Sequence, residues 1–193
     1  MNILLRLSKK IDALNGWIGS AALWLVLAVV LLSAFNAIMR YAFSYSSNAF
    51  LEAQWYLFGL IFMSCSGYTL LRNEHVRVDV LLSRMPKRVR LWVDILGIFF
   101  FLLPMSIGII ALSWPVFMHT FETGEMSNSA GGLIVWPARL MIPAGFFLLV
   151  LQGLSELIKR IACLKGLIPD PAEKTPVPDG ENSAAATGKE ENK

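Results

Sequence analysis

The stretch YTLLRNEHVRVDVLLSRMPKRVR, from Tyr68 to Arg90, decides the fold class of this chain because it is densely basic and lies between two apolar runs. It carries six of the seventeen Lys and Arg residues of the sequence: Arg72, Arg77, Arg84, Lys87, Arg88 and Arg90. The runs on either side, residues 53–71 and 95–118, contain no charged residue. A basic segment between two such runs is typical of a cytoplasmic loop between membrane-spanning helices.

Four uncharged runs have a length suited to a bilayer: residues 13–39, 53–71, 95–118 and 140–155. A helix needs about 20 apolar residues to cross a hydrocarbon core about 30 Å thick, so the first three runs are long enough alone. The fourth is long enough only if it begins near Leu133 or Trp136 and includes Arg139, whose long side chain can reach the interface. An ordinary soluble domain is excluded, because only 16% of the residues are charged against about 25% in soluble domains.

These runs predict an all-α integral membrane protein with four transmembrane helices. The expected spans are about 17–39, 50–71, 94–117 and 134–156, within a membrane domain of residues 1–167. No strands are expected in the spans, because lipid forces the backbone into helices or closed barrels. A cleaved signal peptide is the alternative for the first run, but its uncharged stretch of 27 residues exceeds the apolar core of about 7–15 residues in a signal peptide. We therefore expect a retained helix.

The basic residues near the span ends predict the orientation, since Lys and Arg are enriched on the cytoplasmic side. The 72–94 loop is basic, whereas the 40–52 loop carries only Arg40, and the 119–135 loop carries Glu122 and Glu125 without any Lys or Arg. Further basic residues precede the first span and follow the fourth: Arg6, Lys9, Lys10, Lys159, Arg160 and Lys165. Both termini are therefore expected in the cytoplasm, and both basic-poor loops outside.

The composition changes abruptly after Leu167. Residues 168–193 contain four prolines, six acidic residues and three lysines, but no aromatic residue. Such a segment cannot bury enough apolar area to offset its chain entropy. We expect a disordered cytoplasmic tail.

From His75 to Asp79, polar residues alternate with valines, which is also a strand pattern. Between spans 2 and 3 we expect instead a short amphipathic segment in the cytoplasmic interface, with Val76, Val80 and Leu81 facing lipid or a partner. On a helix, His75 and Asp79 would share one face, as a metal or proton-relay pair could. The chain has only two histidines and two cysteines, however. We therefore expect no cofactor, no metal site and no catalytic residues, and the basic residues at span ends do not indicate nucleic acid.

Three charged residues near the outer ends of the spans are candidate functional residues. Arg40 and Glu52 lie eleven residues apart across a short turn, so an ion pair between them is expected to close the first hairpin; an ion-coupling role for Glu52 is the alternative. Arg139 could bind an anionic substrate, but pairing with Glu122, Glu125 or an acidic residue of another protein is favoured.

Small residues within the apolar runs indicate close helix contacts, because lipid tails supply no hydrophobic drive for helix association. They stand at Gly16 and Gly19, at 64–67 and at Gly145. Gly67 is therefore a candidate contact residue.

Prolines and one amide give further local predictions. Pro104, Pro115 and Pro143 predict kinks or span ends. The pair Trp136-Pro137 predicts a helix start, where the missing N–H of proline costs nothing. Gln152 is expected to form an interhelical hydrogen bond.

Several motifs, taken in order, resemble one known family. They are Arg40-Tyr-Ala-Phe, then Glu52 at the start of the second span, then Gly67-Tyr-Thr-Leu-Leu-Arg72-Asn-Glu-His75-Val-Arg-Val-Asp79-Val-Leu, followed by Pro86. The chain is similar to the small-permease (Q) subunit of tripartite ATP-independent periplasmic (TRAP) transporters, which shows Arg-Tyr after the first span, Glu at the start of the second, and H-[IV]-x-[VI]-D after it. The resemblance covers roughly residues 10–165, and Ser127–Glu156 also looks like the last loop and span of some members.

The resemblance implies a subunit of a complex in a bacterial inner membrane. In this family a periplasmic binding protein captures an organic acid, and a large multi-span permease carries that acid together with coupling sodium ions. The small subunit is expected to brace the large one in the bilayer and to help dock the binding protein. Candidate subunit-interface residues are Arg40, Glu52, Gly67, His75, Asp79 and Arg139.

Two other classes compete with this interpretation. A self-contained four-span transporter would need a carboxylate at mid-depth of the membrane, and Glu52 lies too near the edge. A membrane redox enzyme holding haem or quinone would need intramembrane histidines or paired cysteines, which the spans lack.

Overall fold

The structure, a computed structural model, describes residues 2–45, 47–72 and 86–167. Its helices are α1 (Asn2–Ala42), α2 (Asn48–Leu71), α4 (Lys87–Gly97), the π-helical η1 (Ile98–Leu102), α5 (Leu103–Thr123) and α6 (Trp136–Leu164). The described residues contain no strand, only an isolated bridge between Met126 and Ile134. The all-α prediction is confirmed for this part of the chain, while the predicted interfacial segment and tail lie outside the described residues.

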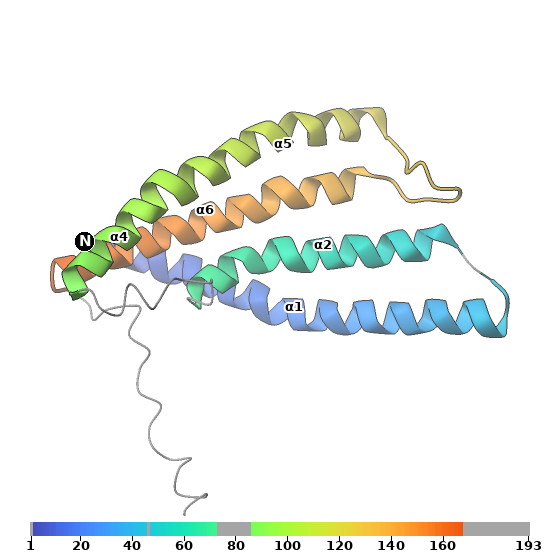
Figure 1. The fold of residues 1–193 in the computed structure, drawn as a ribbon, viewed down its shortest axis with the longest axis horizontal. Helices are drawn as coiled ribbons and strands as arrows, with labels where there is room; N and C mark the ends of the chain where they lie inside the picture. The colour runs from blue at the N-terminus through green and yellow to red at the C-terminus, as the bar shows by residue number, and fades with distance from the viewer. Residues whose placement is uncertain (1, 46, 73–85, 168–193) are drawn as a thin grey trace, which may run out of the picture.

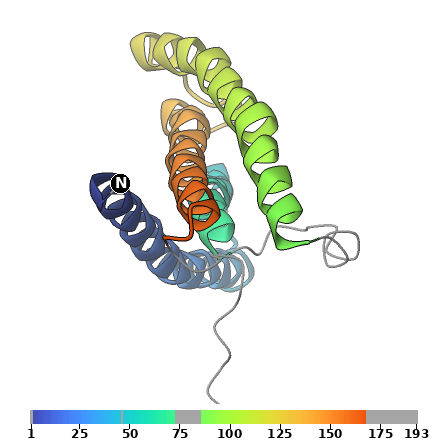
Figure 2. The same cartoon turned by 90° about the vertical axis from the view of Figure 1, so that its left-hand side faces the viewer.

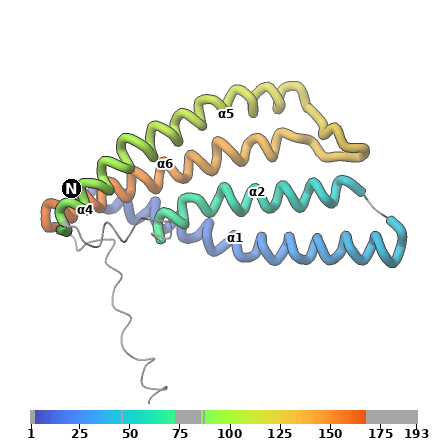
Figure 3. Tube along the Cα trace, viewed as in Figure 1, coloured from blue at the N-terminus to red at the C-terminus, as the bar shows by residue number. Residues whose placement is uncertain are grey.

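The helices lie side by side as long rods, with α4, η1 and α5 following one another as a single rod (Figure 1). α6 is the centre of the bundle, since it packs against α1, α2 and α5, and α1 also packs against α2. Viewed from the end, α6 lies between α1 and the α4–α5 rod (Figure 2). The tube in Figure 3 shows that the α1–α2 turn and the α5–α6 loop lie at one end, and that the start of α4 and the end of α6 lie at the other.

Within the part of the chain that the structure describes, three helical stretches are long and apolar enough to cross a membrane: Ile3–Ala42, Arg88–Thr123 and Trp136–Leu164. α2 is 24 residues long, which corresponds to about 36 Å, but Glu52, Gln54 and a run of small polar residues make its composition more polar. The fourth span therefore remains a prediction.

The helices extend beyond the spans predicted from the uncharged runs. α1 has 41 residues and is therefore about 60 Å long, because its polar first part continues as helix against the end of α6. α6 likewise runs to Leu164. It begins at Trp136 with Pro137 in its first turn, which confirms the predicted helix start.

The rod of α4, η1 and α5 is curved (Figure 1). The N–H of Leu103 bonds to the carbonyl of Ile98, five residues earlier, so the helix widens by one residue there. Pro104 follows directly and has no N–H to donate, which favours such a local rearrangement. Pro115 and Pro143 stand inside α5 and α6, which continue through them.

Two glycines allow the helices of the bundle to approach closely. A Cβ at Gly145 of α6 would lie 2.8 Å from the backbone oxygen of Met63 on α2. A Cβ at Gly67 of α2 would collide with the side-chain oxygen of Asn15 on α1. The predicted close contacts are confirmed at both positions, whereas Gly16 faces open space.

Candidate functional site

At one end of the bundle, α2 holds the loop of residues 124–135 between α5 and α6. The amide of Asn48 donates to the carbonyl of Ala130 at 3.1 Å, and the hydroxyl of Tyr56 donates to the carbonyl of Ile134 at 3.3 Å. Asn48 and Tyr56 are eight residues apart, so they lie on one face of the helix. The loop is thus attached along two turns of α2.

Glu52 lies midway between these two residues and is only 6% exposed. The hydroxyl of Ser127 donates to one carboxylate oxygen, and the N–H of Leu133 donates to the other at 2.6 Å. A Cβ at Gly132 would lie 2.9 Å from Glu52 Oε1, so the loop backbone passes directly over the carboxylate. Together with the arginine described below, these residues form what we call the loop clamp: Asn48, Glu52, Tyr56, Ser127 and Arg139.

The predicted ion pair between Arg40 and Glu52 is wrong. Both carboxylate oxygens of Glu52 accept hydrogen bonds from the 124–135 loop, and no ion pair joins Glu52 to Arg40 among the residues that the structure describes. Arg40 lies in the last turn of α1, where it is exposed. The short distance along the sequence was misleading because the donors for Glu52 come from a loop about 75 residues further on.

Arg139, in the first turn of α6, connects α6 to the loop and to α5. Its two terminal nitrogens reach the carboxylate of Glu125, at 2.8 and 3.2 Å. It also donates to the hydroxyl of Thr120, which itself donates to the carbonyl of Val116 at 2.8 Å. The predicted pairing of Arg139 with Glu125 is confirmed.

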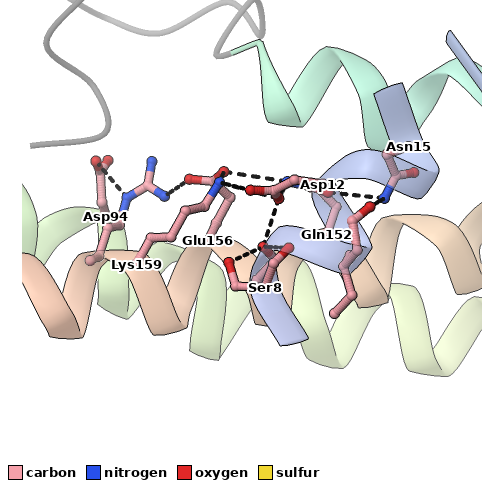
Figure 4. Close-up of polar contacts among 10 residues, drawn as sticks. Ser8, Asp12, Asn15, Asp94, Gln152, Glu156 and Lys159 are labelled. Carbon is pink, nitrogen blue, oxygen red and sulfur yellow. Dashed lines mark hydrogen bonds and ion pairs between the residues drawn. The ribbon is translucent and has the colours of Figure 1, made fainter. Parts of the chain in front are cut away.

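A second set of polar contacts lies at the opposite end of the bundle, between α1, α6 and α4 (Figure 4). We call it the α1–α6 polar cluster, and its members are Ser8, Asp12, Asn15, Asp94, Gln152, Ser155, Glu156, Lys159 and Arg160.

Acidic and basic groups alternate along this cluster. Lys159 lies between Asp12, at 3.1 Å, and Glu156. Arg160 pairs with Glu156 through Nη1 and with Asp94 through Nε, at 3.0 Å. The side chains of Glu156 and Arg160 are only 1% exposed. Such charges are stable away from water only when they are paired and hydrogen-bonded.

Amide groups extend the cluster toward the middle of the bundle. Asn15 donates to the side-chain oxygen of Gln152 at 2.9 Å. Gln152 donates in turn to Asp12 at 2.9 Å and to Glu156 at 3.4 Å. Both hydrogens of this amide and its oxygen are therefore used, and the predicted interhelical hydrogen bond of Gln152 is confirmed.

The two serines have a defined donor order. The hydroxyl of Ser155 donates to Asp12 at 2.7 Å and lies 2.7 Å from the hydroxyl of Ser8. Because Ser155 has a single proton and gives it to the carboxylate, Ser8 must be the donor to Ser155.

Sequence reasoning missed most of this cluster. Lys159 and Arg160 were interpreted as charges at a span end, yet they point inward and are paired. The signal was present: Gln152, Ser155 and Glu156 precede them at helical spacing, so all five residues share one face of α6. A polar face on a mostly apolar helix indicates a buried partner face, which Ser8, Asp12 and Asn15 supply from α1.

The remaining candidates differ in what the structure says of them. Gly67 of α2 is buried, and the atoms nearest to it belong to Asn15 of α1 and Leu148 of α6. His75 and Asp79 lie outside the described residues. Within the described residues, no cluster of three or more His, Cys, Asp or Glu side chains is placed to hold a metal ion. The acids and bases of both ends instead bond to one another, which suits them to fix helices and loops in place.

Replacing Glu156 with glutamine tests the α1–α6 polar cluster. Glu156→Gln keeps the shape but leaves Lys159 and Arg160 without their shared carboxylate, so the free energy of unfolding should fall by about 3–5 kcal/mol. Denaturant unfolding in detergent measures it. The control is Glu122→Gln, an exposed position on α5, which should change stability by less than about 0.5 kcal/mol. Equal effects of the two substitutions would contradict the assignment.

Replacing Glu52 with glutamine tests the loop clamp. Glu52→Gln removes charge-assisted hydrogen bonds worth about 1.5–3 kcal/mol, so the 124–135 loop should open more often. Cleavage after Glu125 by a glutamate-specific protease should then be faster by roughly tenfold or more. Arg40→Gln serves as the control and should leave cleavage unchanged. If Arg40→Gln accelerated cleavage as much as Glu52→Gln does, the result would contradict the loop clamp and would favour the predicted ion pair between Arg40 and Glu52.

The comparisons with known proteins agree with this membrane architecture. Residues 28–163 match the family described as "Tripartite ATP-independent periplasmic transporters, DctQ component", which is a transporter component family. The matched range includes α2, α4, η1 and α5, the last third of α1 and almost all of α6. No curated protein and no solved structure matched the chain. Because the matched range covers well over half of the 193 residues, the chain belongs to the DctQ family of TRAP transporter small subunits.

Proposed function

We propose that this chain braces a large multi-span permease subunit in the membrane and helps to dock a periplasmic substrate-binding protein. Membership of the DctQ family supports the assignment to a tripartite assembly. The observation that carries the proposal is the contrast between the polar interior contacts of the helix bundle and its apolar outer surface. The polar side chains of the loop clamp and of the α1–α6 polar cluster bond within the chain, whereas large apolar side chains cover the outer faces of the helices.

The outer face of α2 illustrates this division. Trp55, Phe58 and Phe62 follow one another at helical spacing and are 65–72% exposed. Trp17 and Trp24 of α1 are exposed to a similar extent. Large exposed apolar surfaces mark contacts with lipid or with another protein. Such faces suit a subunit that packs sideways against a larger membrane protein.

In the proposed topology, α2 crosses the bilayer as a fourth span and both termini lie in the cytoplasm of a bacterial cell, with the chain in the inner membrane. The length of α2 is sufficient for the hydrocarbon core. The distribution of Lys and Arg favours this orientation. The loop clamp then lies on the periplasmic side and the α1–α6 polar cluster near the cytoplasmic side.

The candidate residues take different roles in this proposal. Exposed Arg40 is a direct contact on the outer side. Glu52 and Arg139 act indirectly, because they hold the 124–135 loop in the shape that a partner meets. His75 and Asp79 form the inner contact, as the resemblance to the Q subunits implies. Gly67 acts within the chain, where it lets α1 approach α2.

The transported solute is an organic acid, such as a dicarboxylate, a keto acid or a sugar acid, and the coupling ion is sodium. This part of the proposal rests on the resemblance to the family. In such a system the solute and the ions pass through the large subunit, so the small subunit needs no binding site of its own.

Cysteine labelling tests the topology. In a variant whose two cysteines are replaced (Cys65→Ala, Cys163→Ala), Ser129→Cys should react with a membrane-impermeant maleimide in cells with a permeable outer membrane. Ser183→Cys should react only after the inner membrane is opened, because residues 168–193 are expected in the cytoplasm. Labelling of both cysteines from the same side would show that the chain crosses the membrane an even number of times between residues 129 and 183, where the proposal has the single crossing of α6, and would reject the proposal.

Reconstituted uptake tests the function. Proteoliposomes that hold this chain with its large permease and binding protein should take up a radiolabelled organic acid when a sodium gradient is applied. Omitting this chain should abolish uptake, and this chain alone should give none. Uptake by this chain alone would establish the alternative, a self-contained small transporter.

A further inference from the structure

A groove of about 480 Å³ lies beside the π-helical turn, between the end of α2, the α4–η1–α5 rod and α6. Leu70 of α2, Phe101 and Met105 of the rod, and Phe146 and Leu149 of α6 supply much of its lining. The lining on the rod falls within the stretch Arg88–Thr123 that is apolar and long enough to cross a membrane. The groove is therefore an apolar space at bilayer depth, with a volume in the range of small-molecule sites, about 300–1,000 Å³.

The space arises from the local backbone. Gly97 lines the groove at the last residue of α4, and a Cβ there would meet nothing within 4 Å. Directly after Gly97, η1 widens the helix. Gly153 of α6 packs so closely against the rod that a Cβ there would lie 2.8 Å from the side chain of Leu102. The rod thus contacts α6 tightly at Gly153 and leaves room beside Gly97.

The polar part of the lining is small. Ser106 contributes a hydroxyl, and Asp94 contributes a carboxylate that pairs with Arg160 at 3.0 Å. The side chain of Asp94 is only 12% exposed. A paired carboxylate does not repel an apolar chain as a free one would.

Basic residues precede the groove-lining residues along α4. α4 begins with Lys87, Arg88, Val89 and Arg90. Arg90 precedes Val93, Asp94 and Gly97 by three, four and seven residues, so its Cα lies on the same side of α4 as these lining residues. An apolar groove in the membrane with basic residues at its end matches a phospholipid in both parts, the acyl chain and the phosphate.

We propose that this groove holds an acyl chain of an anionic phospholipid, whose phosphate lies at the basic first turn of α4. The acyl chain alone gains little by leaving the bilayer, because lipid tails are as apolar as the groove. Selection must therefore come from the headgroup, and each Lys or Arg near an anionic membrane surface favours binding by about fivefold. The site does not depend on the transport proposal, since it requires only that the chain lie in a membrane.

Photocrosslinking in the native membrane tests this proposal. The probes are phosphatidylglycerol and phosphatidylcholine with the same diazirine-labelled acyl chain, and mass spectrometry locates the labelled peptides of the full chain. Phosphatidylglycerol should label residues 93–106 and 146–149 at least about fivefold more than phosphatidylcholine does. This measurement uses the unaltered protein, so it holds even if a variant fails to fold.

A matched pair of variants shows whether the groove itself is the site. A Cβ at Gly97 meets nothing within 4 Å, so the larger side chain of Gly97→Leu should extend into the groove and should lower phosphatidylglycerol labelling of residues 93–106 at least fivefold. A Cβ at Gly108, on the same rod, also meets nothing within 4 Å, but Gly108 does not line the groove, so Gly108→Leu should leave labelling unchanged. Both replace a helical glycine, so neither should weaken the helix.

Three results would overturn the proposal. Labelling that Gly97→Leu leaves unchanged would place the lipid elsewhere. Equal labelling by both lipids would remove the role of the basic turn. The third result combines two observations: the unaltered chain carries no label in the groove, and a membrane protein that co-purifies with it is lost in Gly97→Leu. That result would show that the other membrane protein, and not a lipid, occupies the groove.

Discussion

The ion pairs between α1, α6 and α4 are the interactions on which the rest of the bundle depends. Asp12, Lys159, Glu156, Arg160 and Asp94 alternate in charge, and the central pair is almost completely buried. Moving α1 by one turn along α6 would separate Asp12 from Lys159, Gln152 and Ser155, and leaving a mostly buried carboxylate without partners is strongly unfavourable. The cluster thus sets the register of the two helices. Because α6 packs against α1, α2 and α5 alike, a fixed α6 positions all of them.

The opposite end of the bundle is fixed by a different device. There α2 and α6 both hold the 124–135 loop, through Glu52 on one side and Arg139 on the other. Polar contacts therefore fix both ends, while glycines allow close packing in the middle. What remains on the outside along the helices is mostly apolar, and this distribution suits a subunit that supports a neighbour in the bilayer.

Much of this architecture could be predicted from the sequence. The uncharged runs marked the long helices, the pair Trp136-Pro137 marked the start of α6, and the order of Arg40, Glu52 and the His75–Asp79 pattern indicated the family. These features are local, or repeat with a simple period, so a single sequence reveals them. The partner of Glu52 could not be predicted, since hydrogen bonds between residues 75 or more positions apart depend on how the helices pack.

The polar cluster was missed for a related reason. In membrane proteins, Lys and Arg at the end of an apolar run normally mark the cytoplasmic boundary. Because this rule already explains Lys159 and Arg160, their helical spacing relative to Gln152 and Glu156 was not interpreted as a polar face. The π-helical turn could not be predicted either, because Pro104 predicts a kink or a helix end but not a π-helical turn. The curvature of the rod and the groove beside it follow from that turn.

Affinity capture of the full chain from native membranes, under mild solubilisation, tests most directly whether this protein is a bracing subunit. If it is, a much larger multi-span permease should be recovered in equal molar amount and should stay bound when the loop of residues 124–135 is intact. Recovery of the chain alone, from membranes that carry out the uptake, would show that the chain does not brace a permease.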